Sequence, residues 1–313
     1  MPVRHVHLDE PLIGWRKLLM ALASTAVMVF LATACVGAQA SERDLGGSRL
    51  SVITTIPILA DLARNVGGDL VEVRSLLSPG ADVHSFQTTP KDSVVIAGAS
   101  VVIFNGRGLD DFLLPVVTSA ISDSAVLVVA SRDVDVSEKG LGISLVDPHF
   151  WQDPTLAIPY VKMVRDGLIQ ADPDNAAAYT GQAEGYTQRL GELDLEISSI
   201  LGQVPAENRL LVTYHRAFSH LGRRYGWETH ALVAGDGVAV TPSGILGLTR
   251  IIKDNGLPWV FAEPELPTSA LSAAAKESQA SVAPIYAGLS ADGPSTYIDM
   301  MLFNAHSLAE NLR

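Results

Sequence analysis

The chain has 313 residues, one cysteine and a formal net charge of −12. Hydrophobic residues make up 48% of it and charged residues 18%, which is typical of a globular protein with a sizeable core. The negative charge argues against a nucleic-acid-binding protein, because such binding needs clustered Lys and Arg.

The first 34 residues have the pattern of a secretory signal. Basic residues precede an uncharged apolar run over 18–34, which is slightly short for a membrane span. Small residues then lead to Cys35, which resembles the lipidated first residue of a mature bacterial lipoprotein. The alternative is an ordinary signal peptide cleaved after Ala40. Both interpretations predict export, and residues 35–48 are small and polar, as expected of a lipidated tether.

From residue 50 onward, short apolar runs alternate with segments of helical periodicity, which predicts parallel βαβ units. In the first part, strands are expected at 50–54, 71–77, 101–104, 125–130 and 143–146, and helices at 56–66, 89–97 and 109–120.

A single long helix is expected over 172–204. This segment opens on Asp172-Pro173 and then repeats apolar residues at three- and four-residue steps. About 30 helical residues span roughly 45 Å, which is long enough to cross a two-lobed protein. Glycines at 181, 185 and 191 weaken the helix.

After Pro205 the strand–helix alternation resumes. Strands are expected at 210–213, 229–233, 259–262 and 282–286, and helices at 217–225, 243–254, 269–279 and 297–312. The sequence therefore predicts an α/β fold with two parallel-sheet lobes, 49–171 and 205–313, joined by the helix over 172–204.

His84, His149 and His215 each follow one of the predicted strands. In open α/β sheets, ligands bind beyond the carboxyl ends of the strands, so residues distant in sequence can meet there. Imidazole is the commonest metal ligand near neutral pH. The three histidines therefore predict a transition-metal site in the cleft between the lobes. Three further histidines, for which no such context exists, are expected to be structural: His220, His230 and His306.

Six motifs, in order from Leu50 to Leu312, resemble those of the solute-binding proteins of bacterial ABC importers for zinc and manganese. They are Pro79-Gly80-Ala81-Asp82-Val83-His84-Ser85-Phe86, Asn105-Gly106 with Leu109-Asp110, Asp147-Pro148-His149-Phe150-Trp151-Gln152-Asp153-Pro154, His215-Arg216-Ala217-Phe218 with Tyr225-Gly226, Phe261-Ala262-Glu263-Pro264, and Thr296-Tyr297-Ile298-Asp299 with Asn304. Val83, Asp110 and Gln152 depart from the family pattern, which has Pro, Glu and Leu at these positions.

The resemblance implies His84 and His149 from the first lobe and His215 from the second as metal ligands. The family completes its site with an aspartate after the last strand, but Ala287 stands in that place here. Asp292, Glu263 or a water molecule are the alternatives for the fourth position. Asp147 and Asp153 flank His149 and are expected either to orient its ring or to cap a turn.

The resemblance also implies a function. We expect an extracytoplasmic protein, anchored by lipid to the outer face of the cytoplasmic membrane, that captures Zn²⁺ ahead of Mn²⁺. It would deliver the ion as a monomer to an ABC permease with a separate ATPase, and would not be an enzyme. Three histidines tilt the metal toward zinc, because manganese prefers oxygen donors. One alternative is a zinc-dependent hydrolase with three histidines and a water. Another is a surface adhesin stabilised by metal.

Overall fold

The computed structural model describes residues 49–83, 86–135, 147–233 and 239–313. Residues 49–313 form one compact unit. The signal segment and tether expected over 1–48, and the strand expected at 143–146, lie outside the described residues. Within the described ranges, no helix is both long enough and apolar enough to cross a membrane.

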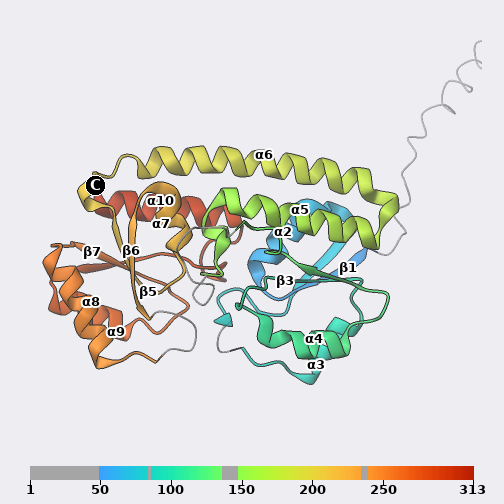
Figure 1. The fold of residues 1–313 in the computed structure, drawn as a ribbon, viewed down its shortest axis with the longest axis horizontal. Coiled ribbons are helices and arrows are strands. Elements are labelled where there is room, and N and C mark those ends of the chain that lie inside the picture. Colours follow the sequence, from blue (N-terminus) through green and yellow to red (C-terminus); the bar gives the residue numbers. More distant parts are fainter. Residues whose placement is uncertain (1–48, 84–85, 136–146, 234–238) are drawn as a thin grey trace, which may run out of the picture. The chain divides into compact units, whose positions relative to one another are not determined.

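The first lobe is built on a parallel sheet with the strand order β2-β1-β3-β4 (Figure 1). Its elements are β1 (Leu50–Thr54), α2 (Pro57–Gly67), η1 (Gly68–Leu70), β2 (Val71–Ser75), α3 (Pro90–Ala97), β3 (Val101–Phe104), η3 (Asp111–Leu113), α4 (Leu114–Ala120) and β4 (Val126–Val129). Helices α3 and α4 pack on one face of the sheet, while α2 packs on the other. All four residues of β3 are buried, since both faces of a parallel sheet are covered.

The second lobe contains two parallel strand pairs, β5–β6 and β7–β8. Strands β5 and β7 lie beside each other, and His215 at the end of β5 contacts Glu263 just after β7, so the carboxyl ends of both pairs lie at the same edge. The elements are η7 (Ala206–Asn208), β5 (Leu210–His215), α7 (Ser219–Tyr225), β6 (Glu228–Val233), α8 (Pro242–Asp254), β7 (Trp259–Ala262), α9 (Ser269–Glu277), β8 (Ser281–Pro284) and α10 (Tyr297–Leu312). The α/β class with parallel sheets in both lobes is therefore confirmed.

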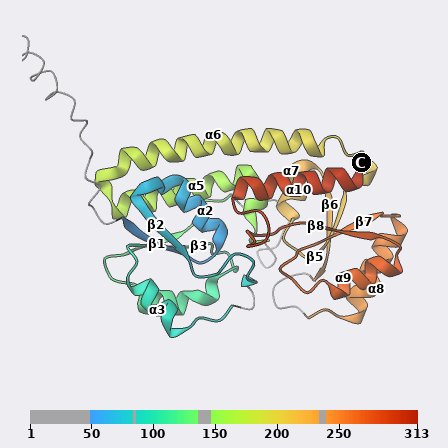
Figure 2. The ribbon, with the colours of Figure 1, turned by 180° about the vertical axis from the view of Figure 1, so that it is seen from behind.

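Helix α6 (Ala176–Leu201) follows the short turn η6 (Pro173–Asn175) and runs along both lobes (Figures 1 and 2). It packs against α2 and α5 of the first lobe and against α10 of the second. Its buried stripe includes Tyr179, Ala183, Tyr186, Leu190, Leu193 and Ile197. On the second lobe, Asp194 accepts hydrogen bonds from Arg224 Nε at 2.8 Å and from Tyr225 Oη at 3.0 Å. The helix is thus bound to both lobes.

We expect Gly185→Ala to raise the free energy of unfolding by about 0.5–1 kcal/mol, because alanine loses less backbone entropy in a helix. A methyl group at Gly185 would have no other atom within 4 Å. Gly167→Ala in α5 is the control, since its Cβ would lie 2.3 Å from Val128 Cγ2, and it should lower stability. Urea unfolding measures both. If the Gly185→Ala variant were less stable than the parent, other atoms would have to pack against this face of α6.

Helix α5 (Pro154–Ala171) was not predicted from the sequence. Pro159 lies inside it, and an interior proline normally argues against a helix. Asp153 caps the helix, with its Oδ1 accepting from Thr155 N at 2.8 Å and Pro154 in the first turn. Buried residues such as Tyr160 and Val164 pack α5 against α2, α6 and β4, which outweighs the backbone bond that Pro159 lacks.

Candidate functional site

His149 lies at the start of the turn η5 (Phe150–Gln152) and is 3% exposed. Oδ1 of Asp147 accepts a hydrogen bond from the backbone N of His149 at 3.0 Å and another from ring Nδ1 at 2.7 Å. An ionised carboxylate can only accept, so Nδ1 carries the proton and Nε2 carries the lone pair. This contact orients the ring as a metal-binding imidazole is oriented in carboxylate–histidine–metal arrangements.

His215 is oriented in the same way. It is the last residue of β5, and Glu263 follows the neighbouring strand β7. Oε1 of Glu263 accepts from Nδ1 of His215 at 2.9 Å, and the same carboxylate accepts from the backbone N of Tyr214 at 3.1 Å and of His215 at 3.4 Å. Glu263 is fully buried. Among the described residues, β5 and β7 are not joined by backbone hydrogen bonds of a sheet. The Glu263 carboxylate therefore links the ends of these two strands.

The two imidazoles meet although they come from different lobes. Their ring centroids are 5.2 Å apart at an interplanar angle of 75°, and Trp151 lies edge-on to His149 at 5.2 Å. The third predicted ligand, His84, lies outside the described residues. Among the residues that are described, no three His, Cys, Asp or Glu side chains already lie close enough to hold an ion. His149 and His215 are therefore the two predicted ligands whose positions the structure describes.

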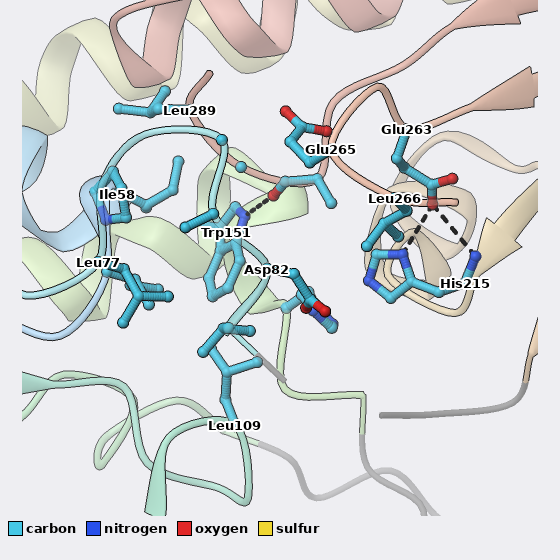
Figure 3. Close-up of a pocket in the computed structure, with 18 residues that line it drawn as sticks. Ile58, Leu77, Asp82, Leu109, Trp151, His215, Glu263, Glu265, Leu266 and Leu289 are labelled. Atoms are coloured by element: carbon cyan, nitrogen blue, oxygen red, sulfur yellow. Dashed lines mark hydrogen bonds and ion pairs between the residues drawn. The ribbon is translucent and has the colours of Figure 1, made fainter. Parts of the chain in front are cut away.

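Both histidines line a pocket of about 80 Å³ (Figure 3). This volume is far below the roughly 300–1,000 Å³ of pockets for drug-sized ligands. Its apolar lining includes Ile56, Leu77, Leu109, Trp151, Leu266 and Leu289. Such an apolar shell limits the access of water and strengthens electrostatic interactions with a small ion.

Comparison with known proteins identifies the family. Residues 52–311 match the family described as the zinc-uptake complex component A, periplasmic (ZnuA). The chain belongs to this family.

Three proteins similar to this chain are named for binding different metals. The chain is 30% identical over 296 residues to the manganese-binding lipoprotein MntA of Halalkalibacterium halodurans, covering 91% of this chain and 96% of that protein. It is 32% identical over 240 residues to the iron-binding protein YfeA of Yersinia pestis, covering 74% and 75% of the two. The structure of the periplasmic zinc-binding protein TroA from Treponema pallidum superimposes with a TM-score of 0.80 at 26% identity, covering 85% and 99%.

Membership of the ZnuA family establishes the class of function. The protein is an extracytoplasmic metal-binding component of an ABC importer, as expected from its motifs. Components of this kind bind and pass on their substrate and are not enzymes, so the family decides against the zinc-dependent hydrolase.

Ala287 stands where the ZnuA family is expected to have its aspartate, and its backbone carbonyl contacts the segment that follows His149. The carbonyl oxygen of Ala287 accepts from Trp151 Nε1 at 2.8 Å and from Gln152 Nε2 at 3.1 Å. Asp292 is exposed and does not line the pocket. Glu265, which the sequence analysis did not single out, does line it (Figure 3). Burial raises the pKa of Glu265, with the Glu263 carboxylate adding to this effect and His215 opposing it.

The segment carrying His149 is also bound to the second lobe. Asp147 Oδ2 accepts from the backbone N of Ser219, at the start of α7, at 3.2 Å. His220 Nε2 lies 2.8 Å from the Asp147 carbonyl oxygen, and Arg223 lies 3.2 Å from His220 Nδ1. Because Arg223 can only donate, His220 carries its proton on Nε2 and donates it to that carbonyl. The contact between His220 and Asp147 could not be predicted from the sequence, because it forms only when the two lobes dock.

The motif at Asn105–Asp110 also contacts the segment that carries His149. The carboxylate of Asp110 accepts from the backbone N of Asn105 at 2.7 Å and of Gly106 at 2.8 Å, which closes the loop after β3. Nδ2 of Asn105 then donates to the Pro148 carbonyl at 3.3 Å. This motif therefore positions the residues around His149, and its Leu109 also lines the pocket.

Proposed function

We propose that this protein captures Zn²⁺, ahead of Mn²⁺, with His84, His149 and His215 as ligands, and delivers it to an ABC permease with a separate ATPase. One observation carries the proposal: two buried imidazoles from different lobes lie 5.2 Å apart, each with Nδ1 held by a carboxylate. Such pairs orient Nε2 for a cation and raise its basicity.

Ligand chemistry supports zinc over manganese. Imidazole nitrogen suits Zn²⁺, whereas Mn²⁺ prefers carboxylate, carbonyl and water oxygen. Relatives are named for binding manganese and iron, and a structural neighbour for binding zinc. The donor set of this chain, and not its relatives' names, therefore supports the choice of zinc.

We also propose that Cys35 is lipidated and that the mature protein works as a monomer tethered through residues 35–48. The lipoprotein name of relatives supports the anchor, and Cys35 lies outside the described residues. The domain boundaries at 49–171, 172–204 and 205–313 stay predictions, as does the adhesin alternative. For the fourth ligand position, the contacts of Glu263 support an orienting role for this residue.

A calorimetric titration tests the proposal. The purified protein is stripped of metal and titrated with Zn²⁺ and with Mn²⁺. We expect one Zn²⁺ per chain, bound more tightly than Mn²⁺. His215→Ala should weaken zinc binding by more than about 100-fold, because loss of an orienting partner alone costs roughly 10–100-fold.

His230→Ala is the matched control for this titration, since His230 pairs with Glu228 at 2.7 Å and does not line the pocket. Its zinc affinity should equal that of the parent. Equal zinc affinity in His215→Ala would contradict the proposed site.

A further inference from the structure

Three acidic side chains line the described part of the pocket: Asp82, Glu263 and Glu265. Glu263 already accepts three hydrogen bonds, from Tyr214 and twice from His215. Asp82 precedes His84 by two positions, which is the spacing of Asp147 from His149. This spacing favours a ring-orienting role for Asp82 as well. The orientation of His215 thus accounts for Glu263, and the spacing assigns a similar role to Asp82.

Glu265 differs from the other two acids. Its Oε1 is buried and has no hydrogen-bond partner among the described residues. A buried carboxylate oxygen without a partner costs free energy, so an uncompensated one calls for an explanation. Glu265 lines the same pocket as His149 and His215.

Glu265 also lies where two loops meet. Its Cγ is next to Gly80, on the loop that leads to His84, and Ser290 lies next to Gly80 as well. The backbone N of Gly80 donates to the Leu289 carbonyl at 2.9 Å, which joins the loop at 78–83 to the loop at 287–291. The second of these loops is where the aspartate of the family would be expected, and Ala287 offers no carboxylate there.

We propose that Glu265 supplies the anionic ligand that this site lacks at Ala287. The inference rests on the proposed function. In Figure 3, Glu265 stands beside Glu263 with its carboxylate turned away from the ring of His215, so its side chain must rotate inward when the ion binds. The rotation gives the unpartnered oxygen a cation to contact.

Charge explains why such a ligand is needed. Neutral imidazoles leave two positive charges on a divalent ion in an apolar pocket, and burial of charge is costly. One carboxylate reduces the net charge to one. Carboxylate oxygen also suits Mn²⁺ better than imidazole does. Glu265 is therefore expected to contribute more to the affinity for Mn²⁺ than to the affinity for Zn²⁺.

Glu265→Gln tests the proposal, because it keeps the size of the side chain and removes its charge. Zn²⁺ affinity is measured by competition with a chromophoric chelator, next to His215→Ala, Asp292→Asn and the control Glu310→Gln, an exposed residue of α10. Glu265→Gln should weaken Zn²⁺ binding by at least tenfold and Mn²⁺ binding by more. The absorption bands of bound Co²⁺ should shift in Glu265→Gln alone among the three acid-to-amide variants.

The thermal midpoint of the metal-free protein controls for folding. It should stay close to that of the parent in Glu265→Gln, because the variant keeps the size of the side chain and Oε1 has no partner among the described residues to lose. If Glu265→Gln binds Zn²⁺ within threefold of the parent while His215→Ala does not bind, this inference is wrong and the proposed function stands. If His215→Ala also binds normally, the proposed function itself is wrong. Weakening by Asp292→Asn, with Glu265→Gln unaffected, would assign the ligand to Asp292.

Discussion

Saturating Zn²⁺ should raise the unfolding temperature markedly, and His149→Ala should lose most of this rise. A ligand at about 1,000 times its dissociation constant stabilises the folded state by roughly 4 kcal/mol. For a unit of this size, such a gain corresponds to an increase of roughly 8–16 °C. The effect is expected to be large because the ion would join imidazoles of both lobes, whose rings already lie 5.2 Å apart.

Differential scanning calorimetry with and without Zn²⁺ measures this rise, and a chelator should reverse it. His306→Ala is the matched variant, since His306 is exposed on α10 and should leave the zinc effect intact. A full rise in His149→Ala would show that zinc stabilises the protein from another site.

Much of the fold was predictable because the signals are local. The expected bounds of β1, β3, β7 and α10 coincide with those observed. Asn105 after β3, Pro258 before β7 and Thr296 before α10 mark three of these ends in the sequence. No helix was expected where α5 lies; Pro159 lies inside this helix, and the buried face of Tyr160 and Val164 holds it in place. The expected helix at 217–225 begins two residues late, because Ala217 N bonds to the His215 carbonyl in a turn.

In the candidate site too, some features could be predicted from local sequence and others depend on how the lobes dock. The meeting of His149 and His215 could be predicted, because both follow predicted strands and ligands of open α/β sheets bind beyond the carboxyl ends of the strands. The residues that contact these rings differ in how far their roles could be predicted. Asp147 lies two residues from His149, so its orienting role was one of two open alternatives, and the second flanking acid, Asp153, proved to be a helix cap. The contact of His220 with Asp147 spans 73 residues and exists only because the lobes dock.

Asp147→Ala should have the second largest effect, on stability and on metal binding together. The Asp147 carboxylate accepts from the backbone N and Nδ1 of His149 and from the backbone N of Ser219. Removing it leaves these buried donors without that partner, and each buried polar group left unsatisfied costs about 1–3 kcal/mol. Zinc affinity should fall by roughly 10–100-fold, because the ring of His149 loses its orienting group.

The stability loss in Asp147→Ala should depend on pH in one direction. Burial alone would raise the pKa of Asp147, but the electrostatic interaction and hydrogen bonds with His149, together with the electrostatic interaction with His220, outweigh it and lower this pKa below its usual value of 3.8. A carboxyl with a lowered folded pKa stabilises the protein above its unfolded pKa, and this contribution is lost as the pH falls through the folded pKa. The difference from the parent should therefore be complete above about pH 5 and shrink in stronger acid.

Urea unfolding between pH 7 and pH 3, together with zinc competition, checks both effects of Asp147→Ala. Asp123→Ala is the control, since Asp123 is exposed in the loop before β4 and should change stability by less than about 0.5 kcal/mol. If Asp147→Ala unfolds like Asp123→Ala at neutral pH, the carboxylate does not join the lobes. If it loses stability but keeps full zinc affinity, His149 is held by other contacts, and the tie from Asp147 to α7 serves folding alone.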